Sequence, residues 1–107
     1  MSIDRRPPVI SMVGKSGVGK TTALERVIRE IKRRGYRLGT VKHDTHGFEI
    51  DKPGKDSWRH AQAGSDAVVI SGPRKMALVR QLEVEMPLDR IVELMGDVDL
   101  VITEGYK

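Results

Sequence analysis

The sequence predicts an α/β protein with a mostly parallel β-sheet and helices on both of its faces. Short apolar runs of strand length alternate along the 107 residues with segments whose apolar residues recur at helical spacing. Parallel neighbours need a crossover connection, and right-handed helical crossovers cover both faces of a sheet. The length suits one compact unit, so we expect residues 1–107 to form a single domain.

The first half of the chain is predicted to form a strand, a helix and a second strand. Residues 9–13 are a mostly apolar run that ends at a glycine-rich stretch, which is typical of a buried strand. Between residues 20 and 34 the apolar side chains recur at i, i+3, i+4 and i+7, and Gly35 then ends the helix. Residues 37–42 are predicted to form the second strand, and a polar loop follows over residues 43–55.

The second half is predicted to begin with a short helix. Asp56 or Ser57 can cap this helix, which runs to residue 63 and is closed by Gly64. The remaining predicted elements are bounded by turn residues. They are strands over residues 67–71 and 76–80, a helix that follows Pro87 and extends up to Gly96, and a last strand over residues 98–103.

Composition narrows the class of protein. The sequence holds no cysteine, which excludes disulfides and thiolate zinc sites and fits a reducing compartment. No apolar run approaches the ~18 residues of a membrane span, so we expect a cytoplasmic protein without a membrane partner. Residues 1–50 hold 11 basic and 5 acidic side chains, which suits a small polyanion. Nucleic acid is the weaker interpretation, because this half offers only two aromatic residues for base stacking.

The strongest chemical signal is a phosphate-loop (Walker A) motif, G-x-x-x-x-G-K-[ST], between the first strand and the first helix. Glycines let successive backbone N–H groups turn toward phosphate oxygens, and the helix directs its positive end at the same place. This context predicts a P-loop NTPase-like three-layer fold that binds a nucleoside phosphate. The expected binding residues are Gly14, Lys15, Ser16, Gly17, Val18, Gly19, Lys20, Thr21 and Thr22.

Magnesium is expected at the same site. Lys20 would reach the β- and γ-phosphates, and the Thr21 hydroxyl would bind Mg²⁺. In a parallel sheet the phosphate loop lies at the carboxyl ends of the strands, where Glu104 ends the last strand. Glu104 is therefore the predicted second ligand or water-positioning carboxylate, whereas Asp97 and Asp99 are assigned to the turn before that strand.

The polar loop after the second strand should lie over the same face. Lys42, His43, His46 and Lys55 supply donors suited to a phosphate or another anionic ligand, and Asp44 is a candidate general base. A metal site built from the two histidines, or a solvated loop, remains an alternative interpretation of this segment.

Five blocks of the sequence together resemble one known family. They are the phosphate loop with Lys20-Thr21-Thr22, residues 42–48 (KHDTHGF), 51–57 (DKPGKDS), Ala63-Gly64 and 99–107 (DLVITEGYK). The phosphate loop is shared with many NTPases, but the KHDTHGF and DKPGKDS blocks are far more specific. With them the chain closely resembles the molybdopterin-guanine dinucleotide biosynthesis protein B (MobB) family over nearly its whole length.

This resemblance implies a GTP-binding accessory protein, usually a homodimer, that assists the guanylyltransferase MobA in attaching GMP to molybdopterin. It implies slow GTP hydrolysis at most, and not the nucleotidyl transfer itself. Family members continue well beyond the EGYK-like segment, so the chain is expected to lack their C-terminal part. Two alternatives stay open: a P-loop small-molecule kinase with Asp44 as base, and a metal-insertion GTPase that uses His43 and His46.

Lys15 carries a separate hypothesis. Its position after Gly14 partly matches an extra lysine of a subgroup of dimeric P-loop ATPases, in which that lysine reaches the partner's nucleotide, although Ser16 stands where the subgroup has glycine. If Lys15 acts in this way, Lys15→Ala will lower GTP turnover at dimer-forming concentrations. Unchanged turnover would make Lys15 a solvated loop cation.

Overall fold

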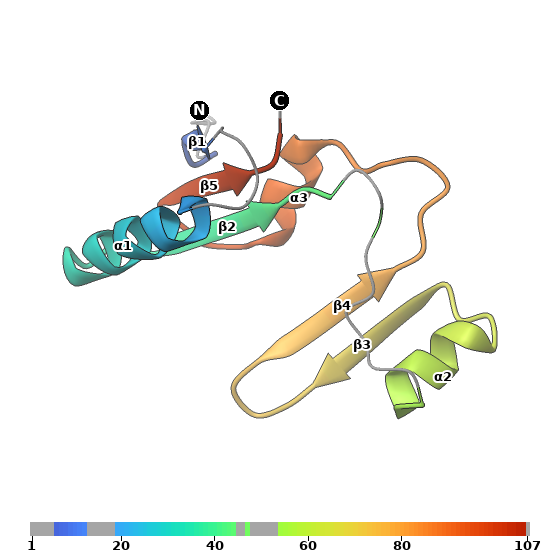
Figure 1. Ribbon diagram of the computed structural model, residues 1–107. Coiled ribbons are helices and arrows are strands. Elements are labelled where there is room, and N and C mark those ends of the chain that lie inside the picture. Colours follow the sequence, from blue (N-terminus) through green and yellow to red (C-terminus); the bar gives the residue numbers. More distant parts are fainter. Residues whose placement is uncertain (1–5, 13–18, 45–46, 48–53, 107) are drawn as a thin grey trace, which may run out of the picture. The chain divides into compact units, whose positions relative to one another are not determined.

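A computed structural model describes the chain apart from residues 1–5, 13–18, 45–46, 48–53 and 107 (Figure 1). The chain divides into two compact units. The first unit combines Met1–Thr45 with Pro87–Lys107, and the second unit is His46–Met86. The expectation of a single domain stays a prediction. Strands and helices alternate as predicted: β1 (Val9–Met12), α1 (Lys20–Arg33), β2 (Leu38–Lys42), α2 (Asp56–Gln62), β3 (Ala67–Ser71), β4 (Met76–Arg80), α3 (Leu88–Leu94) and β5 (Leu100–Glu104).

The first unit is built on a parallel sheet of three strands in the order β1-β5-β2. On the central strand, the exposed fractions of Val101 and Ile102 are 0% and 2%. Because consecutive side chains of a strand point to opposite faces, both faces of β5 are covered. Figure 1 shows α1 in front of β2 and α3 behind it. The predicted α/β fold with a parallel sheet and helices is therefore confirmed.

Helix α1 buries part of its apolar stripe, on which Val27 stays 40% exposed, and its described charged side chains lie on the surface. Leu24 is buried on this stripe, whereas Glu30 accepts hydrogen bonds on the surface from Arg33 and Arg34, which lower the pKa of its carboxyl. The helix ends at Gly35 as predicted. There φ is +89°, the Gly35 N–H donates to the Lys32 carbonyl, and the following N–H donates to the Ile31 carbonyl.

Asp99 forms two hydrogen bonds with Arg37 at the amino end of the parallel sheet. Its N–H donates to the Arg37 carbonyl and its Oδ2 accepts from the Arg37 N–H, each over 2.7 Å. Strand β5 therefore begins at Leu100, two residues later than predicted, because Val98 belongs to a turn in which its N–H donates to the Gly96 carbonyl. Asp99 lies before the strand, in agreement with its assignment to a turn.

The second unit is an antiparallel hairpin of β3 and β4 with α2 against β3. Both strands have the predicted bounds, but they pair with each other rather than with the parallel sheet. The reason is their short connection, in which the Gly72 N–H donates to the Lys75 carbonyl. Four residues can close a hairpin, whereas a parallel pair needs a crossover of a dozen residues or more.

The predicted cap of α2 is wrong. Lys55 occupies the N-cap position in an extended conformation, and no side chain caps the helix. Asp56 lies inside the first turn, where its carboxylate complements the positive end of the helix dipole instead. Among the described residues, no helix is long and apolar enough to cross a membrane.

Candidate functional site

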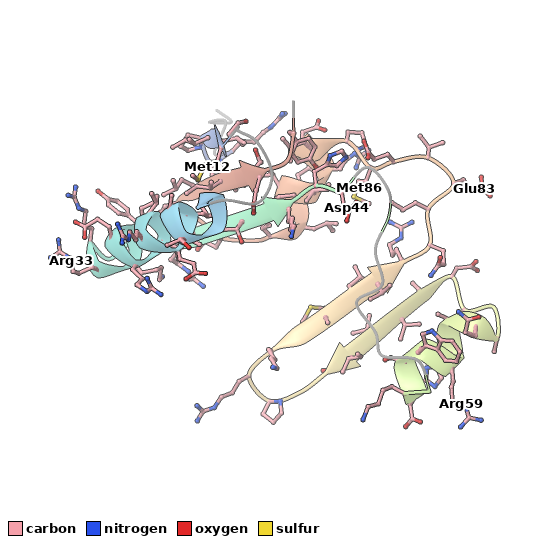
Figure 2. The ribbon with its side chains drawn as sticks, viewed as in Figure 1. Met12, Arg33, Asp44, Arg59, Glu83 and Met86 are labelled. Atoms are coloured by element: carbon pink, nitrogen blue, oxygen red, sulfur yellow. The ribbon has the colours of Figure 1, made fainter. Side chains whose placement is uncertain are left out.

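The three parallel strands of the first unit end side by side. Met12 of β1 and Lys42 of β2 both lie in register with Glu104 of β5. We call these residues and those that directly follow them the carboxyl edge. In Figure 2 Asp44 lies just beyond the arrowhead of β2, whereas Arg33 lies at the far end of α1. Strands β1, β2 and β5 therefore end at the same edge of the sheet, as predicted.

The start of α1 fits an anionic ligand. Gly19 is the N-cap with φ of +78°, a left-handed conformation that favours glycine, and the Ala23 N–H donates to its carbonyl to close the first turn. Among the side chains that the structure describes none caps this helix, and its first turn holds no acidic residue. The first N–H groups of a helix have no intrahelical acceptor and carry the positive end of its dipole, so this terminus suits a phosphate.

Several predicted phosphate contacts lie outside the described residues. These are Gly14, Lys15, Ser16, Gly17 and Val18, together with the side chains of Lys20 and Thr21. Thr22 lies exposed in the first turn of α1. The roles of these residues in phosphate and magnesium binding stay predictions.

Glu104 lies at the centre of the carboxyl edge. It is half-buried, between Met12 and Lys42 on the neighbouring strands, and its carbonyl accepts a hydrogen bond of 2.8 Å from the His43 N–H. One residue earlier, the fully buried Thr103 donates from its hydroxyl to Ser11 Oγ over 3.2 Å. These contacts hold β5 to both neighbours just before the candidate site. Asp99, at the other end of β5, takes no part.

The sequence reasoning missed two residues of this edge, Gly105 and Tyr106. The Tyr106 ring stacks on the His43 imidazole, with centroids 4.4 Å apart and an angle of 23° between the planes. Gly105 has φ of +97°, and a Cβ there would lie 2.6 Å from the His43 carbonyl oxygen. In the sequence the two residues stand out only as part of the 99–107 block of the family resemblance, which assigns them no role, and as a glycine and an aromatic residue directly after Glu104.

The predicted loop residues are divided between the two units. Lys42, His43 and Asp44 belong to the first unit, whereas Lys55 is the N-cap of α2 in the second unit. His46 lies outside the described residues. Within the part of the chain that the structure describes, no group of three metal-ligating side chains is present. The metal-insertion alternative, which needs His46, stays untested.

Comparisons with known proteins agree with the motifs. The family model for molybdopterin guanine dinucleotide synthesis protein B matches residues 9–107. The molybdopterin-guanine dinucleotide biosynthesis adapter protein of Haemophilus influenzae is 37% identical over 102 residues, which cover 94% of this chain and 57% of that protein. Its namesake in Escherichia coli is 35% identical over 104 residues, covering 94% and 59%.

A solved structure of a protein from the same family also matches this chain. The crystal structure of Bacillus subtilis MobB aligns with a TM-score of 0.76 at 31% identity, and the match covers 92% of this chain and 61% of that one. The chain thus spans about three fifths of the length of these relatives. With its phosphate-loop motif before α1 and its parallel sheet ending in Glu104, the chain belongs to the family of molybdopterin guanine dinucleotide synthesis protein B.

Proposed function

We propose that this chain binds GTP and Mg²⁺ at the carboxyl edge and serves as an accessory protein of molybdenum cofactor biosynthesis. It would assist the guanylyltransferase MobA in attaching GMP to molybdopterin. The observation that carries the proposal is the meeting of Glu104 with the Lys42–Asp44 segment, in the unit that also holds the uncapped start of α1. Membership of the family supports the pathway. A cytoplasmic location is part of the proposal.

Each group at this edge has a proposed task. The phosphate loop would hold the triphosphate through backbone N–H groups and Lys20, while Thr21 and Glu104 would hold Mg²⁺. Glu104 or Asp44 could orient a water for slow GTP hydrolysis. The transfer of GMP itself would belong to MobA.

A binding panel of GTP, ATP and molybdopterin, each with and without Mg²⁺, tests the nucleotide part. We expect Mg²⁺-dependent GTP binding and competition by ATP, because phosphate-loop contacts ignore the base. Slow loss of GTP without transfer to an acceptor would support the accessory role. Transfer at about 1–100 s⁻¹ to a small acceptor would instead support the kinase alternative.

The segment after β2 is proposed to serve the pathway rather than the triphosphate. We expect His43→Ala and Lys55→Ala to leave Mg²⁺–GTP affinity nearly intact while lowering GMP transfer to molybdopterin in the presence of MobA. His60→Ala is a matched control, because this histidine lies exposed on α2. Loss of GTP binding as large as that of Lys20→Ala would make these residues nucleotide contacts. Unchanged GMP transfer in both variants would mean that the segment after β2 is only a solvated loop.

We also propose a homodimer, supported by one apolar face of the hairpin in the second unit. Val69 and Leu78 lie opposite each other in register, and Met76 lies on the same face; their exposed fractions are 55%, 41% and 61%. The other face carries the buried Val68. A second copy would cover the exposed face, and the reach of Lys15 to a partner's nucleotide belongs to this proposal.

Leu78→Glu should shift the dimer toward monomer, measured by light scattering during gel filtration. The change loses the burial of the exposed two fifths of one leucine per copy, about 0.6–1.2 kcal/mol, and adds a charge that the interface would have to desolvate. Arg74→Glu, in the turn of the same hairpin, is the control for a new carboxylate away from this face. A parent chain that is monomeric, or equal masses for both variants, would contradict the proposed dimer face.

A further inference from the structure

Three consecutive residues after the core of β5 contact His43, each in a different way. The Glu104 carbonyl accepts the His43 N–H over 2.8 Å. Gly105 brings its backbone so close that a Cβ would lie 2.6 Å from the His43 carbonyl oxygen. The Tyr106 ring stacks on the His43 imidazole at 4.4 Å. The segment after β5 thus contacts the backbone and the ring of a residue far away in the sequence.

These contacts lie where the strand ladder ends. Lys42 is the last residue of β2 in register with β5, so His43 lies beyond the paired part of the strand. The hydrogen bond of the His43 N–H holds its backbone, and the stack on the Tyr106 ring restricts the orientation of its imidazole. Both side chains are partly shielded from solvent, and the His43 Nδ1 atom is buried.

We propose that Tyr106 is a positioning residue, which holds the His43 imidazole, and with it the Lys42–Asp44 segment, at the carboxyl edge beside Glu104. The inference rests on the proposed function only for what the segment does once it is held. Tyr106 does not contact the nucleotide in this proposal; it acts through His43. A change of the segment after β5 is therefore transmitted to the segment after β2.

The stack itself is tested by the NMR shifts of the His43 ring protons. Tyr106→Phe keeps a stacking face and should leave these resonances near their parent positions. Tyr106→Leu should move them toward the positions of the exposed His60. Tyr36→Leu is the matched control, because the sequence holds two tyrosines and this one is 51% exposed. If Tyr106→Leu unfolds, Tyr106→Met provides a second variant without an aromatic face. Unchanged His43 resonances in a folded Leu or Met variant would overturn the proposal.

The consequence for function is tested by a double-mutant cycle with His43→Ala. We expect Tyr106→Leu to lower assisted GMP transfer about two- to twelvefold, the range of a stacked aromatic pair. Tyr106→Phe should keep the transfer at the parent value. The double variant Tyr106→Leu with His43→Ala should transfer GMP no less than His43→Ala alone. Effects that multiply would overturn the action through His43. If the parent chain neither binds GTP nor assists transfer, the proposed function fails, while the NMR shifts still decide the positioning role.

Discussion

Lys20→Ala should weaken the binding of Mg²⁺–GTP about 12- to 150-fold. The lysine follows the N-cap Gly19 at the start of α1, and in the phosphate-loop motif it makes a charge-assisted contact with the β- and γ-phosphates. Loss of such a contact raises the free energy of binding by about 1.5–3 kcal/mol, and 1.4 kcal/mol is a factor of ten. Titration calorimetry at fixed Mg²⁺ measures the change.

The control for this prediction is Lys32→Ala, which removes the same charge from the last turn of the same helix. It should leave the affinity near that of the parent, because the opposite end of α1 is away from the carboxyl edge. Thr21→Ala should clearly reduce the dependence of GTP binding on Mg²⁺, whereas it should change the free energy of unfolding only slightly. Parent-like GTP binding by both Lys20→Ala and Thr21→Ala would show that the phosphate-loop assignment is wrong.

Gly105→Ala should lower the free energy of unfolding by about 2–5 kcal/mol. A residue with a Cβ is strained by about 1–2 kcal/mol at the positive φ of this position. The new Cβ would also displace the His43 carbonyl, which threatens the hydrogen bond to Glu104 and the stack on Tyr106, each about 0.5–1.5 kcal/mol. Urea unfolding followed by circular dichroism measures the loss.

Gly35→Ala separates the loss due to backbone strain from the loss due to the contacts of His43. Gly35 has φ of +89°, but apart from Gly35 and its two chain neighbours no described atom lies within 4 Å of where its Cβ would be. This variant should show the backbone strain alone, so the difference between the two variants reports the contacts of His43. Equal losses would mean that the close approach of Gly105 to His43 adds nothing to stability. The same difference should appear in the His43 ring-proton shifts, which only Gly105→Ala should change.

Local patterns in the sequence were sufficient to predict most of the helices and strands. The bounds of β3 and β4 agree with the prediction residue for residue, and α1 ends at Gly35 because a left-handed glycine is a local requirement. The phosphate-loop motif is contiguous, so its chemistry can be recognised without any fold. The placement of Glu104 at the carboxyl edge follows from the rule that parallel strands end together.

The remaining features depend on which segments meet in space. The short turn after β3 favours a hairpin with β4, but it does not reveal that this hairpin forms a sheet of its own. The α2 cap depends on the backbone path into the helix rather than on residue type. The contacts of Gly105 and Tyr106 with His43 join segments far apart in the chain, so no periodicity or spacing reveals them. The sequence by itself therefore determined the α/β pattern, the phosphate loop and the family. Only the tertiary structure decided which residues support one another at the carboxyl edge, because that support comes from backbone approach and ring stacking across separate strands.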